Sequence, residues 1–261
     1  MNLDLSGTNA LVCGSSKGIG RAVAIEIALL GANVTLVARS AGALSSLVEQ
    51  LDRSRDQHHD FLQADFARPE ELRKAVHGLV TGKTIHVLVN NTGGPPAGPI
   101  LEADAEGFRE AYTKHLIANH LLAQLIVPGM KQAGYGRIIN IISTSVKEPL
   151  EGLGVSNTTR GAVGNWAKTL ANELGPHGIT VNNVLPGMTD TGRLRSLIRT
   201  RAEAAGLSEE EMAQHMRQAV PLRRFADPKE LGAAVAFLAS PAAAYITGTN
   251  LVVDGGRTRS L

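Results

Sequence analysis

Three closely spaced glycines near the start of the chain constrain its fold more than any other feature. An apolar run at residues 9–13 is followed by Gly14, Gly18 and Gly20, and an apolar segment of helical period comes next. In a strand–turn–helix unit the first glycine permits the tight turn, the second lets the backbone approach a phosphate, and the third lets the helix pack closely. The free N–H groups at the helix start attract an anion. We therefore predict that this loop holds the pyrophosphate of a dinucleotide, through Gly14, Ser16, Lys17, Gly18, Ile19 and Gly20.

Short apolar runs alternate with amphipathic segments along the rest of the chain. Strands are predicted over residues 9–13, 33–38, 85–90, 137–142, 180–185 and 250–253, with a weaker one over 61–64. Helices are predicted over 19–30, 69–79, 108–130, 155–174 and 228–239. This alternation is typical of an α/β fold with a parallel sheet. We expect a single-domain Rossmann fold over residues 1–261, a doubly wound parallel sheet with helices on both faces.

Composition excludes several classes of function. The 26 Lys and Arg residues stand against 24 Asp and Glu, no basic run occurs, and aromatic residues make up 3% of the chain. Such a chain lacks the basic groove and stacking aromatics of a nucleic-acid binder. No apolar run is long enough to cross a membrane, and the first residues lack the basic region of a signal peptide. With Cys13 as the single cysteine and no metal-ligand spacing among the histidines, we expect a cytoplasmic protein without a bound metal.

The segment from Thr191 to Pro221 interrupts the alternation. Its basic residues are five arginines and one histidine: Arg193, Arg195, Arg199, Arg201, His215 and Arg217. Because ligands of such sheets bind at the carboxyl ends of the strands, a helical excursion at residues 191–221 is a candidate lid over the substrate. A pair of solvated helices without a function explains the same pattern.

The end of the second predicted strand indicates which dinucleotide is bound. An acidic residue there would hydrogen-bond the adenosine ribose and favour NAD, but Ala38 and Arg39 occupy the position. Arg39 and Lys17 can both reach a 2′-phosphate, so NADP(H) is the predicted cofactor. The alternative is that both are ordinary surface cations.

Further segments, in order, resemble the short-chain dehydrogenase/reductase family in its single-domain form. They are the glycine loop, Asp65, the stretch Asn90-Asn91-Thr92-Gly93, the loop from Pro186 to Thr191, and the C-terminal stretches 230–240 and 246–256. The resemblance is nearest to 3-oxoacyl-carrier-protein reductases. It implies a homotetramer or homodimer, a small carbonyl or hydroxyl substrate, and cofactor contacts by Asp65, Asn91, Gly93, Arg160, Pro186, Gly187, Thr189 and Thr191.

The catalytic positions depart from the family pattern of Ser, Tyr and Lys with a helix Asn. Ser143 matches the family serine, but Ser156 stands at the tyrosine position and Arg160 at the lysine position. No tyrosine in the chain is followed at the fourth position by lysine, and His115 aligns with the helix Asn. A serine hydroxyl is a far weaker acid than a phenol, and arginine stays protonated. His115 has an ordinary pKa near neutrality and is a candidate proton donor, unless it is a plain helix histidine.

Three hypotheses fit these residues. The first is an NADP(H)-dependent oxidoreductase in which Ser143, Ser156, Arg160 and His115 form an altered catalytic site. The second is an NADP(H)-binding protein with little or no reductase activity, in a regulatory or binding role. The third, a lyase or dehydratase using the same pocket, has no positive support in the sequence.

Overall fold

The computed structural model describes residues 1–260, and its centre is a seven-stranded parallel sheet in the order β3-β2-β1-β4-β5-β6-β7. The strands are β1 (Asn9–Cys13), β2 (Asn33–Ala38), β3 (Asp60–Gln63), β4 (Val87–Asn90), β5 (Gly136–Ile141), β6 (Ile179–Pro186) and β7 (Asn250–Val253). The strand order reverses between β1 and β4, and the crevice at such a reversal is where ligands bind in open α/β sheets. The predicted Rossmann fold is confirmed.

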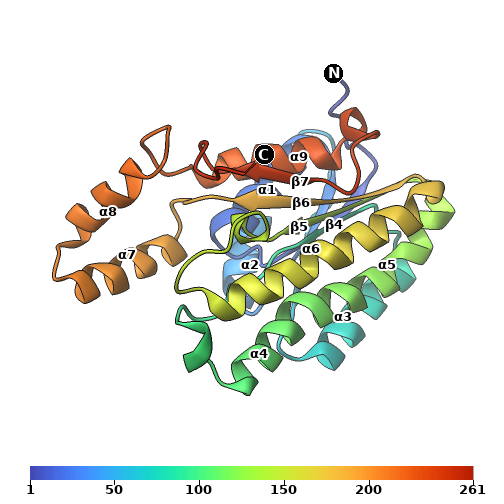
Figure 1. Ribbon diagram of the computed structural model, residues 1–261. Helices are drawn as coiled ribbons and strands as arrows, with labels where there is room; N and C mark the ends of the chain where they lie inside the picture. The colour runs from blue at the N-terminus through green and yellow to red at the C-terminus, as the bar shows by residue number, and fades with distance from the viewer. Residues whose placement is uncertain (261) are drawn as a thin grey trace.

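Helices cover both faces of the sheet (Figure 1). One layer contains α1 (Gly18–Leu29), α2 (Ala41–Val48) and α9 (Pro228–Ala239), and the other contains α3 (Pro69–Gly82), α5 (Ala118–Ala133) and α6 (Gly154–Leu174). Each helical layer forms a hydrophobic core with one face of the sheet, and successive strand residues point to the two cores in turn. Val12, for example, packs in the core of the first layer and Leu11 in that of the second. The strands are therefore buried on both sides, which explains their continuous apolar runs.

The helix predicted over residues 108–130 is interrupted in the structure. It consists of α4 (Ala105–Tyr112), a π-helical turn (Thr113–Ile117) and α5. The prediction of one continuous helix is wrong because apolar periodicity cannot register a single wide turn. Such turns occur frequently at functional sites. This one carries His115, whose side chain is 1% exposed.

Four asparagines form a row of side-chain amides across neighbouring strands. Nδ2 of Asn90 donates to Oδ1 of Asn140 at 2.8 Å, Asn140 donates to Asn183 at 2.9 Å, and Asn183 donates to Asn250 at 2.8 Å. The four residues are direct partners in the registers of β4 to β7. The buried amides thus satisfy one another, which removes most of the cost of taking them out of water.

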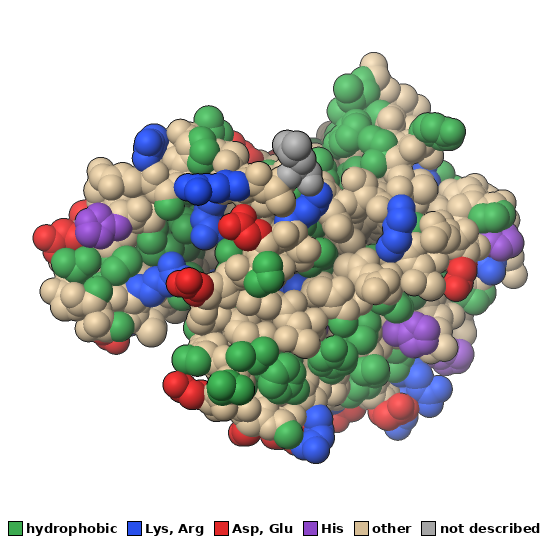
Figure 2. Space-filling view, viewed as in Figure 1, with side chains coloured by type: hydrophobic (Ala, Val, Ile, Leu, Met, Phe, Trp, Pro, Cys, Tyr) green, Lys and Arg blue, Asp and Glu red, His purple; other side chains and the backbone are tan. Residues whose placement is uncertain are grey.

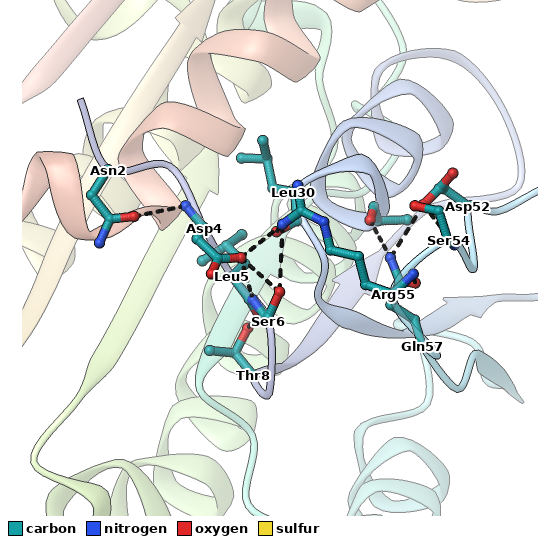
Figure 3. A network of polar contacts seen from close by, with 11 residues as sticks. Asn2, Asp4, Leu5, Ser6, Thr8, Leu30, Asp52, Ser54, Arg55 and Gln57 are labelled. Atoms are coloured by element: carbon teal, nitrogen blue, oxygen red, sulfur yellow. Dashed lines mark hydrogen bonds and ion pairs between the residues drawn. The ribbon is translucent and has the colours of Figure 1, made fainter.

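The amino-terminal segment is fastened to the connection between β2 and β3 (Figure 3). Nη1 of Arg55 lies 2.8 Å from Oδ1 of Asp4 and also donates to the carbonyl of Leu30, while the Arg55 backbone N–H donates to Oε1 of Gln57. Leu5, beside these polar groups, is completely buried. The segment is therefore part of the packed domain.

Two helices, α7 (Gly192–Ala205) and α8 (Glu209–Gln218), project from the body of the molecule at the left of Figure 1. They pack on each other through a small apolar cluster that includes Leu194, Ile198, Ala213 and Met216. A capping box between Ser208 and Glu211 starts α8. Residues 191–221 thus form the helical excursion that the sequence indicates, and their role as a lid stays a prediction.

Candidate functional site

The glycine loop lies where β1 ends and α1 begins, and two of its glycines cannot be replaced without a clash. A Cβ on Gly14 would overlap the carbonyl oxygen of Asn91, and a Cβ on Gly20 would overlap the carbonyl oxygen of Gly14. Gly14 also has a φ of 59°, in the left-handed region. Nδ2 of Asn91 donates to the carbonyls of Cys13 and Gly14, both at 3.2 Å, so Asn91 holds the loop. The loop after β4 and the loop after β1 therefore form one unit.

The start of α1 is open to an anion. Lys17 occupies the N-cap position, makes no side-chain cap hydrogen bond and is exposed, while Ser16 and Ile19 are half-buried beside it. A Cβ on Gly18 would lie 3.3 Å from Cγ2 of Thr191, so the loop after β6 approaches the same place. A helix start with free N–H groups and a nearby lysine suits a pyrophosphate.

The residues predicted to hold the adenosine end lie on adjacent strands. Arg39 follows β2 and is exposed, and its carbonyl accepts a hydrogen bond from Nε2 of Gln63 at the end of β3. Asp65, half-buried, follows two residues later and accepts from the N–H of Ala67. Arg39 and Asp65 are thus brought to one edge of the sheet, beyond the carboxyl ends of their strands.

The residues predicted to meet the nicotinamide end come from the far side of the crevice. The N–H of Gly187 donates to the carbonyl of Val253 at 2.9 Å, and a Cβ on Gly187 would press on Asp254. Pro186 ends β6, and Oγ1 of Thr189 donates to the carbonyl of Gly187 at 3.3 Å. This loop is therefore fixed against β7.

Two serines supply hydroxyl groups at the catalytic positions. Ser143 follows β5, is half-buried, and its Oγ accepts a hydrogen bond from the N–H of Ser145 at 3.1 Å. This bond leaves the hydroxyl proton of Ser143 available to a ligand oxygen. Ser156, in the first turn of α6, is also half-buried, and within residues 1–260 its hydroxyl has no hydrogen-bond partner.

Arg160 lies one helical turn beyond Ser156 on α6 and is 7% exposed. Its Nη1 donates to the carbonyl of Ile141 at 3.2 Å, on the last residue of β5. Burial, and secondarily the positive charge of Arg193, lower the pKa of Arg160 to about 10, so it remains a cation at neutral pH. Arg160 therefore places a buried positive charge in the site, beside the end of β5.

His115 is placed against the loop after β4. Its Nδ1 lies 2.5 Å from Oγ1 of Thr92, and its Nε2 is buried without a hydrogen-bond partner among the described residues. Burial, followed by the charges of Arg160 and Lys114, lowers the pKa of His115 to about 2. His115 therefore does not keep the ordinary pKa of an unperturbed histidine: the ring is neutral at physiological pH, and its role as a proton donor stays a prediction.

Two site residues escaped the sequence analysis. Thr92 contacts His115, and its signal was the departure from alanine in the Asn-Asn-Ala-Gly segment of the family. Arg193 lies close enough to lower the pKa of Arg160, and its Nη2 donates to the carbonyl of Pro95 at 2.7 Å. No sequence pattern predicts that Arg193 lies near Arg160, because only the three-dimensional fold brings α7 close to the site.

Other candidates do not form reactive groups. Cys13 is completely buried, and burial raises the pKa of its thiol. Among residues 1–260, no three His, Cys, Asp or Glu side chains are grouped so that they could hold a metal ion. In the same part of the chain no helix has the length and apolar character needed to cross a bilayer.

The comparisons with known proteins agree with this geometry. A family model described as Enoyl-(Acyl carrier protein) reductase matches residues 14–258. The 7alpha-hydroxysteroid dehydrogenase of Escherichia coli K12 is 30% identical over an alignment that covers 100% of this chain and 98% of the relative. The chain belongs to the short-chain dehydrogenase/reductase family.

Other members of the short-chain dehydrogenase/reductase family are equally similar. A chloroplastic tropinone reductase homologue of Arabidopsis thaliana is 33% identical, with 97% of this chain and 76% of the relative covered. The crystal structure of L-sorbose reductase from Gluconobacter frateurii, complexed with NADPH and L-sorbose, superposes with a TM-score of 0.93 at 32% identity and covers both chains fully. An actinorhodin polyketide ketoreductase with NADPH superposes with a TM-score of 0.90 at 29% identity, covering 97% of each chain.

Proposed function

We propose that the protein is an NADP(H)-dependent oxidoreductase that acts on a small carbonyl or hydroxyl substrate. The observation that carries the proposal is the cofactor frame beside Ser143: the glycine cradle, the open start of α1 and the fixed loop after β6 lie around the carboxyl edge of one sheet. The family relatives with NADPH in their structures support the choice of cofactor. In this chain, Lys17 and Arg39 provide the positive charges for a 2′-phosphate, and no acidic residue ends β2.

The chain fits this cofactor because its backbone leaves the required space. A side chain at Gly14 or Gly20 would fill the cradle, and Lys17 at the N-cap adds charge without capping the helix itself. When bound, the cofactor supplies the hydride that converts a carbonyl carbon to a hydroxyl-bearing carbon. The remaining tasks fall to side chains: the substrate oxygen has to be held, and it has to receive a proton.

Ser143 and Ser156 are the groups that would hold the substrate oxygen. Both hydroxyls have a proton to donate, since Ser143 Oγ is used only as an acceptor and Ser156 is unpaired within the described residues. Arg160 would hold ribose hydroxyls with its planar fork. His115, being neutral, would orient the loop after β4 through Thr92, and water would deliver the proton.

A turnover assay with matched variants tests this proposal. NADPH oxidation is followed with a panel of ketones, oxo acids and acyl thioesters, and NADPH and NADH binding is titrated in parallel. We expect tighter binding of NADPH, turnover of at least one substrate, and a loss of about 100-fold or more in kcat/KM for Ser143→Ala, as is typical when a donor to a developing oxyanion is removed. Absence of turnover across the panel, with NADPH bound, contradicts the proposal.

That last outcome is the alternative function, an NADP(H)-binding protein with a regulatory or binding role. The observation that favours it is the exchange of the tyrosine and lysine positions for Ser156 and Arg160. A phenol beside a lysine is a better proton donor than a serine hydroxyl. If Ser143→Ala and Ser156→Ala leave every measured property unchanged, this reading replaces the first.

The assembly and location follow as proposals from the family. Figure 2 shows hydrophobic side chains gathered over the face formed by α4 and α6, and Ile117, in the adjoining π turn, is 48% exposed. A homotetramer or homodimer through this face is proposed, and light scattering after size-exclusion chromatography tests it by the mass in solution. Three further points stay predictions: the cytoplasmic location, the resemblance to 3-oxoacyl-carrier-protein reductases, and the role of residues 191–221 as a lid.

A further inference from the structure

The buried guanidinium of Arg160 has no anionic partner among the described residues. It is 7% exposed, yet its hydrogen-bond partner among the described residues is a single neutral carbonyl, that of Ile141. A buried charge without a partner is costly, and guanidinium groups bind carboxylates and phosphates with two parallel hydrogen bonds. The charge of Arg160 therefore calls for an anion that arrives from outside the chain.

The groups around Arg160 make the same point. The charged residue that acts on it is Arg193, a second cation, and the ring that faces it, His115, is neutral. Asp190, the acidic residue closest in sequence to Arg193, is already paired with Arg195 at 3.2 Å. Neither guanidinium group forms an ion pair with a carboxylate of residues 1–260.

Both arginines lie beside the loop after β4. Arg193 is exposed, and its Nη2 donates to the carbonyl of Pro95 at 2.7 Å. A Cβ on Gly94, the preceding residue, would lie 4.0 Å from Nη2 of Arg160, so the two guanidinium groups approach the same stretch of this loop.

We propose that Arg160 and Arg193 form an anion subsite for a carboxylate group of the substrate, which makes the substrate a small oxo acid or the matching hydroxy acid. The inference rests on the proposed oxidoreductase function. Ser156 and Arg160 are four residues apart on one helix, so their Cβ atoms are about 5–6 Å apart. A substrate that reaches both side chains therefore carries its carboxylate close to the reacting carbonyl. The second edge of the Arg160 fork remains available for the ribose.

Binding of a carboxylate probe to the protein saturated with NADP⁺ tests the subsite without any turnover. Oxamate, which carries a carboxylate beside a carbonyl, is titrated by calorimetry against oxamide, its neutral counterpart. We expect oxamate to bind at least about tenfold more tightly than oxamide. We also expect Arg193→Gln to weaken oxamate by about tenfold, the range for a charge-assisted hydrogen bond, while NADP⁺ affinity changes less than twofold.

Two further variants complete the design. Arg195→Gln removes the same charge from the same helix, and because Arg195 is paired with Asp190 it should leave oxamate binding unchanged. Arg160→Lys keeps the charge and loses the fork, so it should weaken oxamate. Because the same fork is assigned to the ribose, this variant is titrated at a saturating NADP⁺ concentration established for it. Equal affinities for oxamate and oxamide, or equal weakening by Arg193→Gln and Arg195→Gln, overturn the subsite. If oxamate binding depends on Arg193 but no substrate turns over, the subsite stands and the oxidoreductase function fails.

Discussion

Nδ1 of His115 lies 2.5 Å from Oγ1 of Thr92, which joins the π turn between α4 and α5 to the loop that follows β4. Among the described residues, Thr92 is the one whose side chain makes a hydrogen bond with this buried ring. The opposite nitrogen, Nε2, is buried without a hydrogen-bond partner among the described residues, so the ring is oriented by Thr92 together with the backbone of Gly93. The contact between Thr92 and His115 therefore connects the π turn between α4 and α5 to the loop that contains Asn91 and Gly93.

Removing the Thr92 hydroxyl should destabilise the fold. Thr92→Val keeps the shape of the side chain but leaves Nδ1 of His115 without this hydrogen bond, which costs about 1–3 kcal/mol in a buried setting. Thr92→Ser keeps the hydroxyl and is the matched control, with a smaller loss expected. Urea unfolding of the three proteins measures the difference. Equal stability of the valine and wild-type proteins would show that the contact does not hold the ring.

Acid should destabilise the protein through His115. In the folded chain the pKa of His115 is lowered from 6.5 to about 2, chiefly by burial. Below pH 6.5 the unfolded chain therefore binds a proton that the folded chain does not bind, and the free energy of unfolding decreases as the pH falls. One such group contributes about 1.4 kcal/mol per pH unit over this range.

The comparison with His115→Asn isolates this contribution. Its free energy of unfolding should decline less steeply between pH 6.5 and about pH 5 than that of the wild type, by about 1.4 kcal/mol per pH unit. Substituting the exposed His77 with Asn serves as the control and should leave the wild-type slope unchanged. Parallel curves for wild type and His115→Asn would contradict the assignment.

Arg39 should decide between the two nicotinamide cofactors. Arg39→Ser removes an exposed charge at the end of β2 and should weaken NADPH by about 10- to 100-fold, with little effect on NADH, because a charge-assisted bond to the 2′-phosphate is lost. Lys131→Ser, on the last turn of α5, removes the same charge far from the crevice and should change neither. Fluorescence titration with both cofactors is the measurement. Equal weakening of NADPH and NADH would place Arg39 outside the phosphate site.

The glycine cradle should tolerate no added methyl group. Gly14→Ala forces a Cβ against the carbonyl oxygen of Asn91 and strains a φ of 59°, so loss of detectable NADPH binding is expected. Gly78→Ala, at an exposed position of α3 with open space around its Cβ, should instead stabilise the protein by about 0.5–1 kcal/mol. Cofactor titration and thermal unfolding read the two effects separately. Full NADPH affinity in Gly14→Ala would exclude the loop as a cofactor cradle.

Local patterns were enough to predict the strands and the glycine loop because both depend on neighbours in the sequence. The run at residues 9–13 and the spacing from Gly14 to Gly20 specify a strand, a turn and a helix start without reference to the rest of the chain. The family resemblance then placed Ser143, Ser156 and Arg160 at one edge of the sheet. These assignments required order and spacing, not side-chain environment.

The environment of each group was beyond the sequence. The neutral state of His115 comes from a π turn that buries the ring beside Arg160, and no periodicity indicates that turn. The proximity of Arg193 to Arg160 depends on how α7 leaves β6, which brings residues 33 positions apart to one opening. The features that the sequence did not predict are therefore those that depend on burial and on contacts between residues far apart in the chain.

The asparagine row across β4 to β7 has a direction. Each amide gives its N–H to the next carbonyl oxygen, so the four dipoles point the same way, from an oxygen of Asn90 that has no partner in the described chain to the amide of Asn250. Turning over Asn140 or Asn183 alone would set oxygen against oxygen on one side and N–H against N–H on the other, and turning over either end alone would create one such mismatch. The row can therefore change only as a whole. A substitution at Asn250, on the outermost strand, would remove the acceptor at one end of a row whose other end, Asn90, immediately precedes the loop that holds the glycine cradle.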